Sequence, residues 1–287
     1  MVAPFPDRPS RLVASTDGTR IAVFSAPPAD TDAGAAARLP LLLVHGTTAD
    51  HRTWRVVGPE LARRWPVHAM DRRGRGDSGD VRDAYSIERE LEDVAAVAEA
   101  LAAGARVDAV DVVGHSLGGR IALGASLRTT AIRRVVAYES APTTPARPPG
   151  SRDVLLDALR ADLARGDNEA LLERFMREAV GMPEPDLAAF RADPVWPRRA
   201  AAAPTIVREL EAAETAPAIS LEALARVTVP VLQLAGSAGP AVFRDGAAAL
   251  DARLAAGRLV IIEGARHAAH HSHPAAFVAE IELFLRG

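Results

Sequence analysis

One short pattern in the middle of the chain constrains the fold more than any other feature. The strand-like run 110–113 is followed by Gly114-His115-Ser116-Leu117-Gly118 and then by a helical pattern. A serine flanked by glycines at a strand-to-helix turn is typical of a nucleophile elbow, because small neighbours permit a strained backbone and the turn exposes Oγ above the sheet. A purely structural turn is the alternative, and the strand–helix context favours the nucleophile.

Short apolar runs alternate with helical patterns along most of the 287 residues. This alternation predicts an α/β protein with a doubly wound, mostly parallel sheet that helices cover on both faces. The predicted strands are residues 20–24, 39–44, 67–70, 110–113, 135–138, 229–234 and 259–262. The predicted helices of this part are residues 88–103, 117–127, 241–255 and 274–285.

The alternation stops between about residues 142 and 218, where only amphipathic helical patterns occur, over 151–165 and 168–180. We expect an all-helical cap, or lid, over the carboxyl ends of the strands. The predicted division is a core of residues 1–144 and 217–287 and a cap of residues 145–216. Apolar cap residues suggest a hydrophobic acyl or ring substrate: Phe175, Met176, Met182, Phe190 and Trp196.

The composition excludes several kinds of chemistry. The chain has no cysteine, and all 34 of its basic residues are arginine. Disulfides, thiolate nucleophiles, Schiff bases and Ser–Lys dyads are therefore excluded, so a nucleophile has to be an oxygen or a histidine. A net charge of −3 gives no electrostatic reason for a nucleic acid or an anionic membrane as partner.

The first eleven residues hold three prolines and no apolar stretch of the kind found in signal peptides. No apolar run nearby is long enough to span a membrane. We therefore expect a soluble, cytoplasmic protein that acts on a small molecule as a monomer or homodimer.

The backbone N–H groups of two residues are candidates for an oxyanion hole. The strand-like run 41–44 ends in His45-Gly46-Thr47-Thr48, and this turn can direct the N–H of Thr47 at a developing oxyanion. The second donor is the N–H of Leu117, at the start of the helix that follows Ser116. A plain strand-to-loop turn is the alternative interpretation.

His267 is the candidate general base because it follows the last predicted strand, 259–262. Three further histidines, His270, His271 and His273, raise the possibility of a metal site. No carboxylate lies between His267 and His273, and the spacing is irregular, so we interpret these three as loop residues and expect neither a metal nor another cofactor.

The acid that orients the base is less obvious. In the chain order Ser…Asp/Glu…His it belongs between Ser116 and His267, usually after the strand 229–234. The loop 236–240 holds no carboxylate, and Asp245 falls inside the next predicted helix. Glu139 directly follows the strand 135–138, beside the strand of the serine, so we favour Glu139 over Asp245. A polar loop residue without a catalytic role is the alternative for Glu139.

Together, His45-Gly46, the segment 71–79, the Gly114–Gly119 turn and His267 resemble the α/β-hydrolase superfamily. The resemblance implies an eight-stranded sheet with a helical cap and a Ser116–Glu139–His267 triad. It also implies a structural role for Arg75-Gly76-Asp77 within the segment 71–79.

One branch of this superfamily carries the acid after the earlier strand, as Glu139 would do here. The zearalenone lactonases are such members, and the segments 139–143, 194–196 and 267–274 are similar in placement to theirs. This resemblance makes Trp196 a candidate substrate contact, with packing inside the cap as the alternative.

These observations predict a serine hydrolase that cleaves a carboxylic ester or lactone through an acyl-enzyme. Epoxide hydrolases and haloalkane dehalogenases need an aspartate nucleophile, which Ser116 excludes. Carbon–carbon bond hydrolases and cofactor-free haloperoxidases remain alternatives. A ligand-binding protein with slow or absent turnover is another, because the acid expected near Gly239 is missing.

Overall fold

An eight-stranded sheet forms the centre of the molecule. The structure is a computed structural model that describes residues 5–26, 38–81, 85–142 and 151–287. The strand order is β1-β2-β4-β3-β5-β6-β7-β8, antiparallel for the pairs β1/β2 and β2/β4 and parallel elsewhere. The strands are β1 (Arg11–Ala14), β2 (Arg20–Ala26), β3 (Leu41–Val44), β4 (Val67–Met70), β5 (Val110–His115), β6 (Ile132–Tyr138), β7 (Val231–Gly236) and β8 (Gly257–Ile262).

The mostly parallel sheet predicted from the sequence is confirmed, and all seven predicted runs are strands. The strand that the sequence did not reveal is β1, a four-residue edge strand with three exposed side chains. β6 begins three residues earlier than predicted, because the partly exposed Arg133 and Arg134 extend it and break the apolar pattern.

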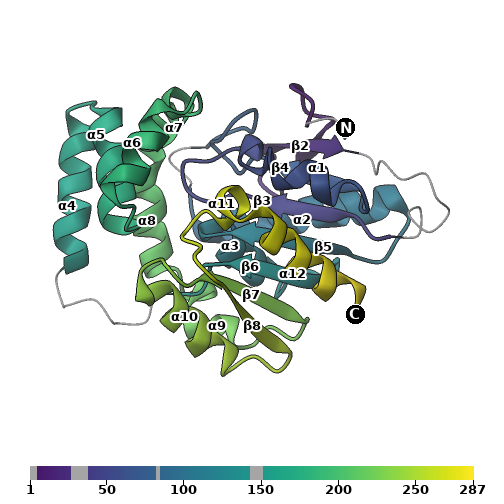
Figure 1. Cartoon of the computed structure of the whole chain (residues 1–287). Helices are drawn as coiled ribbons and strands as arrows, with labels where there is room; N and C mark the ends of the chain where they lie inside the picture. The colour runs from purple at the N-terminus through teal and green to yellow at the C-terminus, as the bar shows by residue number, and fades with distance from the viewer. Residues whose placement is uncertain (1–4, 27–37, 82–84, 143–150) are drawn as a thin grey trace.

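Helices cover both faces of the sheet (Figure 1). One face packs against α1, α11 and α12, and the other against α2, α3, α9 and α10. The bounds are η1 (His51–Trp54), α1 (Val57–Leu61), α2 (Ile87–Ala105), α3 (Leu117–Ala125), η5 (Pro217–Ile219), α9 (Leu221–Leu224), α10 (Ala241–Asp251), α11 (Ala269–Ser272) and α12 (Pro274–Arg286).

Local sequence explains the longest of these helices. The Ser86 side chain caps α2 by accepting the Arg89 backbone N–H, and two glutamates follow in the first turn. Ile87, Leu91 and Val94 recur at the three- to four-residue spacing of one helix face, and all three are buried against the sheet.

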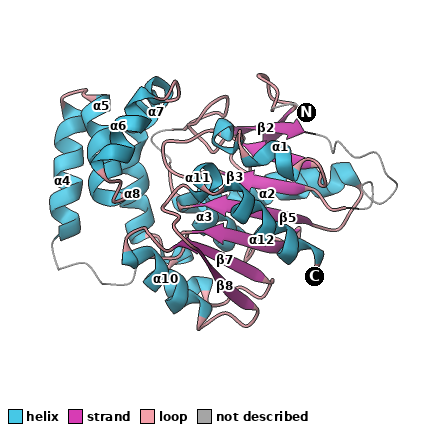
Figure 2. Cartoon of the chain, viewed as in Figure 1, coloured by secondary structure: helices cyan, strands magenta, loops and turns pink. Residues whose placement is uncertain are grey.

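Residues 151–216, here named the helical segment, lie between β6 and β7 and form a separate group of helices beside the sheet (Figures 1 and 2). Thirteen of its buried apolar residues form a core of their own. The predicted boundary at residues 144 and 145 lies outside the described residues. The helices are α4 (Ser151–Ala164), α5 (Asn168–Arg174), a π-helical turn η3 (Phe175–Ala179), α6 (Glu184–Ala192), α7 (Trp196–Ala202), η4 (Ala203–Thr205) and α8 (Ile206–Thr215).

A fully buried ion network joins the helical segment to the sheet. Glu209 of α8 accepts hydrogen bonds from Arg72, at 3.0 Å, and from Arg75, both in the loop after β4. Arg72 also pairs with Glu90 of α2. Arg75 is therefore buried in an ion pair, which agrees with the structural interpretation of Arg75-Gly76-Asp77. Within the described residues, no helix is long and apolar enough to cross a membrane.

Candidate active site

Ser116 occupies a tight turn between β5 and α3. Its backbone has φ 53° and ψ −128°, a conformation that costs a non-glycine residue about 1–3 kcal/mol. The turn requires its glycines: a Cβ at Gly114 would collide with the backbone of Gly119, and one at Gly118 with the backbone of His45. A Cβ at Gly119 would meet Ser140. The backbone at Ser116 therefore has the tight strand-to-helix turn that the sequence predicts.

The loop after β3 lies directly against this turn. A Cβ on Gly46 would lie 3.1 Å from the Ser116 Cβ, so glycine permits the close approach. His45 fixes the loop, since its Nδ1–H donates to the Gly46 carbonyl at 2.8 Å and its Nε2 accepts the Arg72 N–H at 3.0 Å. Burial holds the His45 pKa well below its usual value, so the ring is neutral. Thr47, next along the loop, lines a cavity together with Ser116.

Glu139 and His267 meet at the carboxyl edge of the sheet. The Nδ1–H of His267 donates to Glu139 Oε2 at 2.6 Å, and Oε1 accepts the Gly236 N–H at 2.9 Å. The carboxylate is buried, and the Glu139 backbone has a positive φ of 46°, which turns the side chain toward β7. Asp245 is exposed on α10. Of the two acids considered, the structure therefore brings Glu139 to the base.

Two further residues hold His267, and neither was identified from the sequence. The Nε2–H of His115 donates to the His267 carbonyl at 2.7 Å, and burial lowers the His115 pKa well below its usual value, so this ring is a neutral donor. Phe243 of α10 stacks on the His267 imidazole with ring centroids 4.6 Å apart. His115 lies inside the elbow motif, so the sequence placed it near the site. Its hydrogen bond to a residue 152 positions away could not be predicted from the sequence.

Ser116 and His267 open into a cavity of about 560 Å³, a size usual for a small-molecule site. The helical segment supplies most of its apolar wall: Phe175, Met176, Val180, Met182, Phe190 and Val195. Trp196, expected as a substrate contact, is not part of the wall. It is buried in the core of the helical segment, edge-on to Phe190 with centroids 5.3 Å apart. Its indole packs behind the wall because Phe190 occupies the cavity side.

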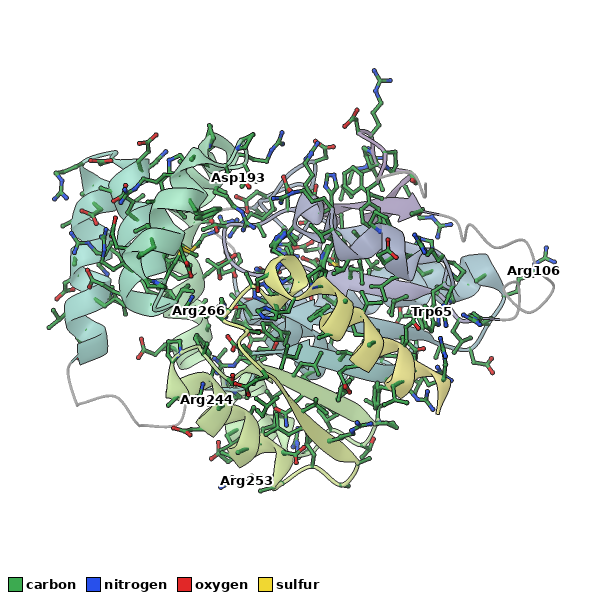
Figure 3. All side chains as sticks on the ribbon, in the orientation of Figure 1. Trp65, Arg106, Asp193, Arg244, Arg253 and Arg266 are labelled. Carbon is green, nitrogen blue, oxygen red and sulfur yellow. The ribbon has the colours of Figure 1, made fainter. Side chains whose placement is uncertain are left out.

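Charged side chains line the cavity as well. Arg55, Arg199 and Arg266 contribute guanidinium groups, and Asp186 and Asp193 contribute carboxylates. Figure 3 labels Asp193 on the helical segment and Arg266 on the loop before α11, the two parts of the molecule that line the cavity from opposite sides. In the sequence these residues are ordinary members of polar helices and loops, so no pattern singled them out.

The three histidines after His267 also line the cavity. His270 is buried, and its Nε2 lies 3.3 Å from the Thr53 hydroxyl; His271 Nε2 lies 3.5 Å from the same oxygen. Burial lowers the His271 pKa to about 4 and that of His270 well below its usual value. Among the described residues, no group of three or more histidine and carboxylate side chains is placed to hold a metal ion.

The family model described as the alpha/beta hydrolase family matches residues 41–281. The chain belongs to the alpha/beta hydrolase family. The resemblance and the fold inferred from the sequence are thereby confirmed, as is the prediction that the protein is an enzyme of the hydrolase class. The narrower similarity to zearalenone lactonases rests on motif placement and stays a prediction.

Three similar proteins illustrate the range of this family. A pimeloyl-[acyl-carrier protein] methyl ester esterase of Neisseria meningitidis serogroup B (strain H44/76) is 31% identical over 261 residues, covering 85% of this hydrolase and 92% of that protein. A 2-succinyl-6-hydroxy-2,4-cyclohexadiene-1-carboxylate synthase of Serratia proteamaculans is 29% identical, covering 88% and 95%. An alpha/beta hydrolase structure from Sphaerobacter thermophilus has a TM-score of 0.75 at 28% identity, covering 93% and 99%. Two relatives that are nearly equally identical to this chain therefore carry names for different reactions.

Proposed function

We propose that the protein is a serine hydrolase that cleaves a carboxylic ester or lactone of a hydrophobic small molecule through an acyl-enzyme. The observation that carries the proposal is the His267–Glu139 hydrogen bond, together with the cavity that both His267 and Ser116 line and whose wall is largely apolar. The esterase names of several relatives are consistent with it.

In the proposed mechanism, Ser116 Oγ attacks the substrate carbonyl while His267 Nε2 accepts its proton. Glu139 holds the Nδ1–H tautomer and stabilises the imidazolium that forms. His267 then protonates the leaving alcohol, and the same base activates water to release the acid from Ser116. Each step uses only side chains of the chain, its backbone and water.

The backbone N–H groups of Thr47 and Leu117 are proposed to bind the oxyanion of the tetrahedral intermediate. Leu117 begins α3, so its N–H is one of the first-turn donors without an intrahelical acceptor. Gly46 allows the Thr47 loop to lie close to the nucleophile, because a Cβ added to Gly46 would be only 3.1 Å from the Ser116 Cβ.

We propose that residues 145–216 act as a cap over a core of residues 1–144 and 217–287. The separate apolar core of the helical segment supports this division. Its contribution to the cavity wall supports a role in binding the apolar part of the substrate, while the strand ends supply the chemistry.

Turnover of 4-nitrophenyl hexanoate by the wild type, Ser116→Ala and Ser126→Ala tests the proposal. Ser126 caps the end of α3, where its hydroxyl donates to the Leu123 carbonyl, and serves as the matched control. We expect Ser116→Ala to lose at least about 10³-fold in kcat and Ser126→Ala to stay within about threefold. Equal rates for Ser116→Ala and wild type would refute the assignment.

The structure gives less support to the alternative of a ligand-binding protein with slow or absent turnover. That alternative was based on the missing acid near Gly239, and Glu139 places a carboxylate against His267 close to that position. An added Cβ on Gly239 would lie only 3.5 Å from Glu139 Oε1, so a carboxylate from either position would lie in the same small region.

A further inference from the structure

Two of the three arginines that line the cavity are neutralised by carboxylates of the cavity wall. Arg55 Nη2 lies 3.2 Å from Asp193 Oδ2, and Arg266 Nη1 lies 2.9 Å from Asp186 Oδ2. All four side chains line the cavity, and both pairs are partly exposed. Their charges are therefore compensated before any ligand enters.

Arg199 of α7 is different. Its Nη1 donates to the Thr48 hydroxyl at 3.3 Å and its Nη2 to the Thr53 hydroxyl at 3.2 Å. In the part of the chain that the structure describes, its guanidinium forms no ion pair with a carboxylate. A guanidinium has five N–H groups, so these two bonds leave three donors for another acceptor.

The surroundings of Arg199 carry charges of both signs at longer range. Asp50 and Asp193 attract the guanidinium, whereas Arg55 and Arg75 repel it. Burial is the largest influence, and it lowers the Arg199 pKa to about 10, which still leaves the group charged at neutral pH. A partly buried cation without a carboxylate in contact is less favourable than a paired one, and an anionic ligand relieves that cost.

Two histidines lie near enough to Arg199 for its charge to affect them. Burial lowers the pKa values of His270 and His271, so both rings are neutral at pH 7 and add no further positive charge there. Among the described residues, the cavity wall therefore combines an apolar surface with one cation, Arg199, that no carboxylate contacts directly.

We propose that Arg199 binds a carboxylate carried by the acyl part of the substrate, so that the enzyme prefers esters whose acyl chain ends in an anionic group. This inference rests on the proposed function and adds the substrate class to it. A guanidinium suits this role because its planar N–H groups match the geometry of a carboxylate. The apolar wall would bind the methylene chain between the carboxylate and the ester.

Arg199 also has a structural role, because its bond to Thr48 links α7 to the loop that carries Thr47. If that link were essential to the oxyanion hole, Arg199→Gln would slow the hydrolysis of every substrate alike. A pair of esters with the same leaving group and chain length separates the two roles, because only the charge at the chain end differs between them.

The experiment compares mono-4-nitrophenyl adipate with 4-nitrophenyl hexanoate in four proteins: wild type, Arg199→Gln, Arg199→Lys and Arg198→Gln. Arg198 is the matched control, since it is the neighbouring arginine of α7, has a side chain 54% exposed and does not line the cavity. We expect wild type to prefer the adipate ester. Arg199→Gln should lower kcat/KM for it roughly 10- to 100-fold, mainly through KM, and change the hexanoate ester less than about threefold.

Arg199→Lys should retain part of the preference, and Arg198→Gln should leave it unchanged. An equal loss on both esters in Arg199→Gln, or a wild type without preference for the adipate ester, overturns the proposal.

A binding measurement keeps this inference separate from the proposed function. Calorimetry with monomethyl adipate compares Ser116→Ala with the double variant Ser116→Ala/Arg199→Gln, and methyl hexanoate serves as the neutral ligand. We expect the second substitution to weaken the binding of monomethyl adipate at least about tenfold and to leave the binding of methyl hexanoate nearly unchanged. If wild type hydrolyses no ester but this difference is found, the hydrolase function fails and the anion site stands. If the two ligands respond alike, the anion site fails.

Discussion

The strand-end loops and the helical segment enclose the same cavity by different physical means. The loops after β3, β5, β6 and β8 are held by backbone constraints, seen in the positive φ values of Ser116 and Glu139 and in the contacts that require Gly46, Gly114 and Gly118. The helical segment consists of ordinary amphipathic helices around an apolar core, with charged side chains toward the cavity. The difference supports the proposal that the loops determine the reaction and the helical segment determines the substrate.

The largest expected effect concerns the loop after β6. Glu139→Gln preserves the packing but replaces the carboxylate that holds His267, so kcat for 4-nitrophenyl hexanoate should fall roughly 10³- to 10⁴-fold. Asp245→Asn is the control on exposed α10 and should stay within about twofold. A large loss in Asp245→Asn alone would transfer the role of the acid to α10.

The next effect concerns the contact between the two regions. Glu209→Gln leaves the buried Arg72 and Arg75 without their shared carboxylate, which should lower the free energy of unfolding by about 3–5 kcal/mol. Glu211→Gln, on the same helix but in an exposed pair with Arg160, should cost less than about 1 kcal/mol. Urea unfolding of the three proteins measures both values. Equal stability of Glu209→Gln and wild type would mean that the two regions are joined by other contacts.

A third experiment moves the acid from one strand-end loop to the next. Glu139→Gly removes the carboxylate and relieves the strain of the positive φ at this position. Gly239→Asp adds a carboxylate on a residue whose Cβ lies near the vacated position. The double variant should recover roughly 10- to 100-fold of the kcat lost in Glu139→Gly. Gly239→Asp alone should bring two carboxylates together and lower activity. No recovery would indicate that the β7 loop cannot direct a carboxylate at His267.

The pH dependence of stability should also distinguish the regions, because all eight histidines lie outside the helical segment. Burial lowers the pKa values of His68 and His271 to about 4, and those of His45, His115 and His270 fall as well. A histidine with a lower pKa in the folded state takes up protons more readily when unfolded. Its stabilising contribution is therefore complete above about pH 6.5 and is lost as the pH falls from there toward 4.

For one such histidine the loss between pH 7 and pH 5 is roughly 2 kcal/mol. We expect the free energy of unfolding to fall over this range and His68→Gln to reduce the decrease by about that amount. Urea unfolding at the two pH values measures it. An unchanged pH dependence in His68→Gln would show that this ring does not titrate as expected.

The sequence was most informative where a chemically reactive residue directly follows a strand. Ser116, Glu139 and His267 were predicted as site residues because each follows a strand, and parallel strands bring their carboxyl ends to one edge. The structure brings Glu139 and His267 into hydrogen-bond contact. The edge strand β1 was not predicted because it has only four residues, too few for a clear strand pattern.

Side chains of the helical segment were harder to place. Arg199 and Trp196 lie three residues apart on α7, yet one lines the cavity and the other packs behind it. That distinction depends on how α7 is rotated against its neighbours, which the contacts among helices decide and no local pattern records.

Labelling of the nucleophile tests the central claim most directly. After reaction with diisopropyl fluorophosphate, intact mass and peptide mapping should find one adduct on Ser116 in the wild type, none in Ser116→Ala, and a much slower reaction in Glu139→Gln. An adduct at another residue, or equal labelling rates in wild type and Glu139→Gln, would contradict a serine nucleophile activated through His267 and Glu139.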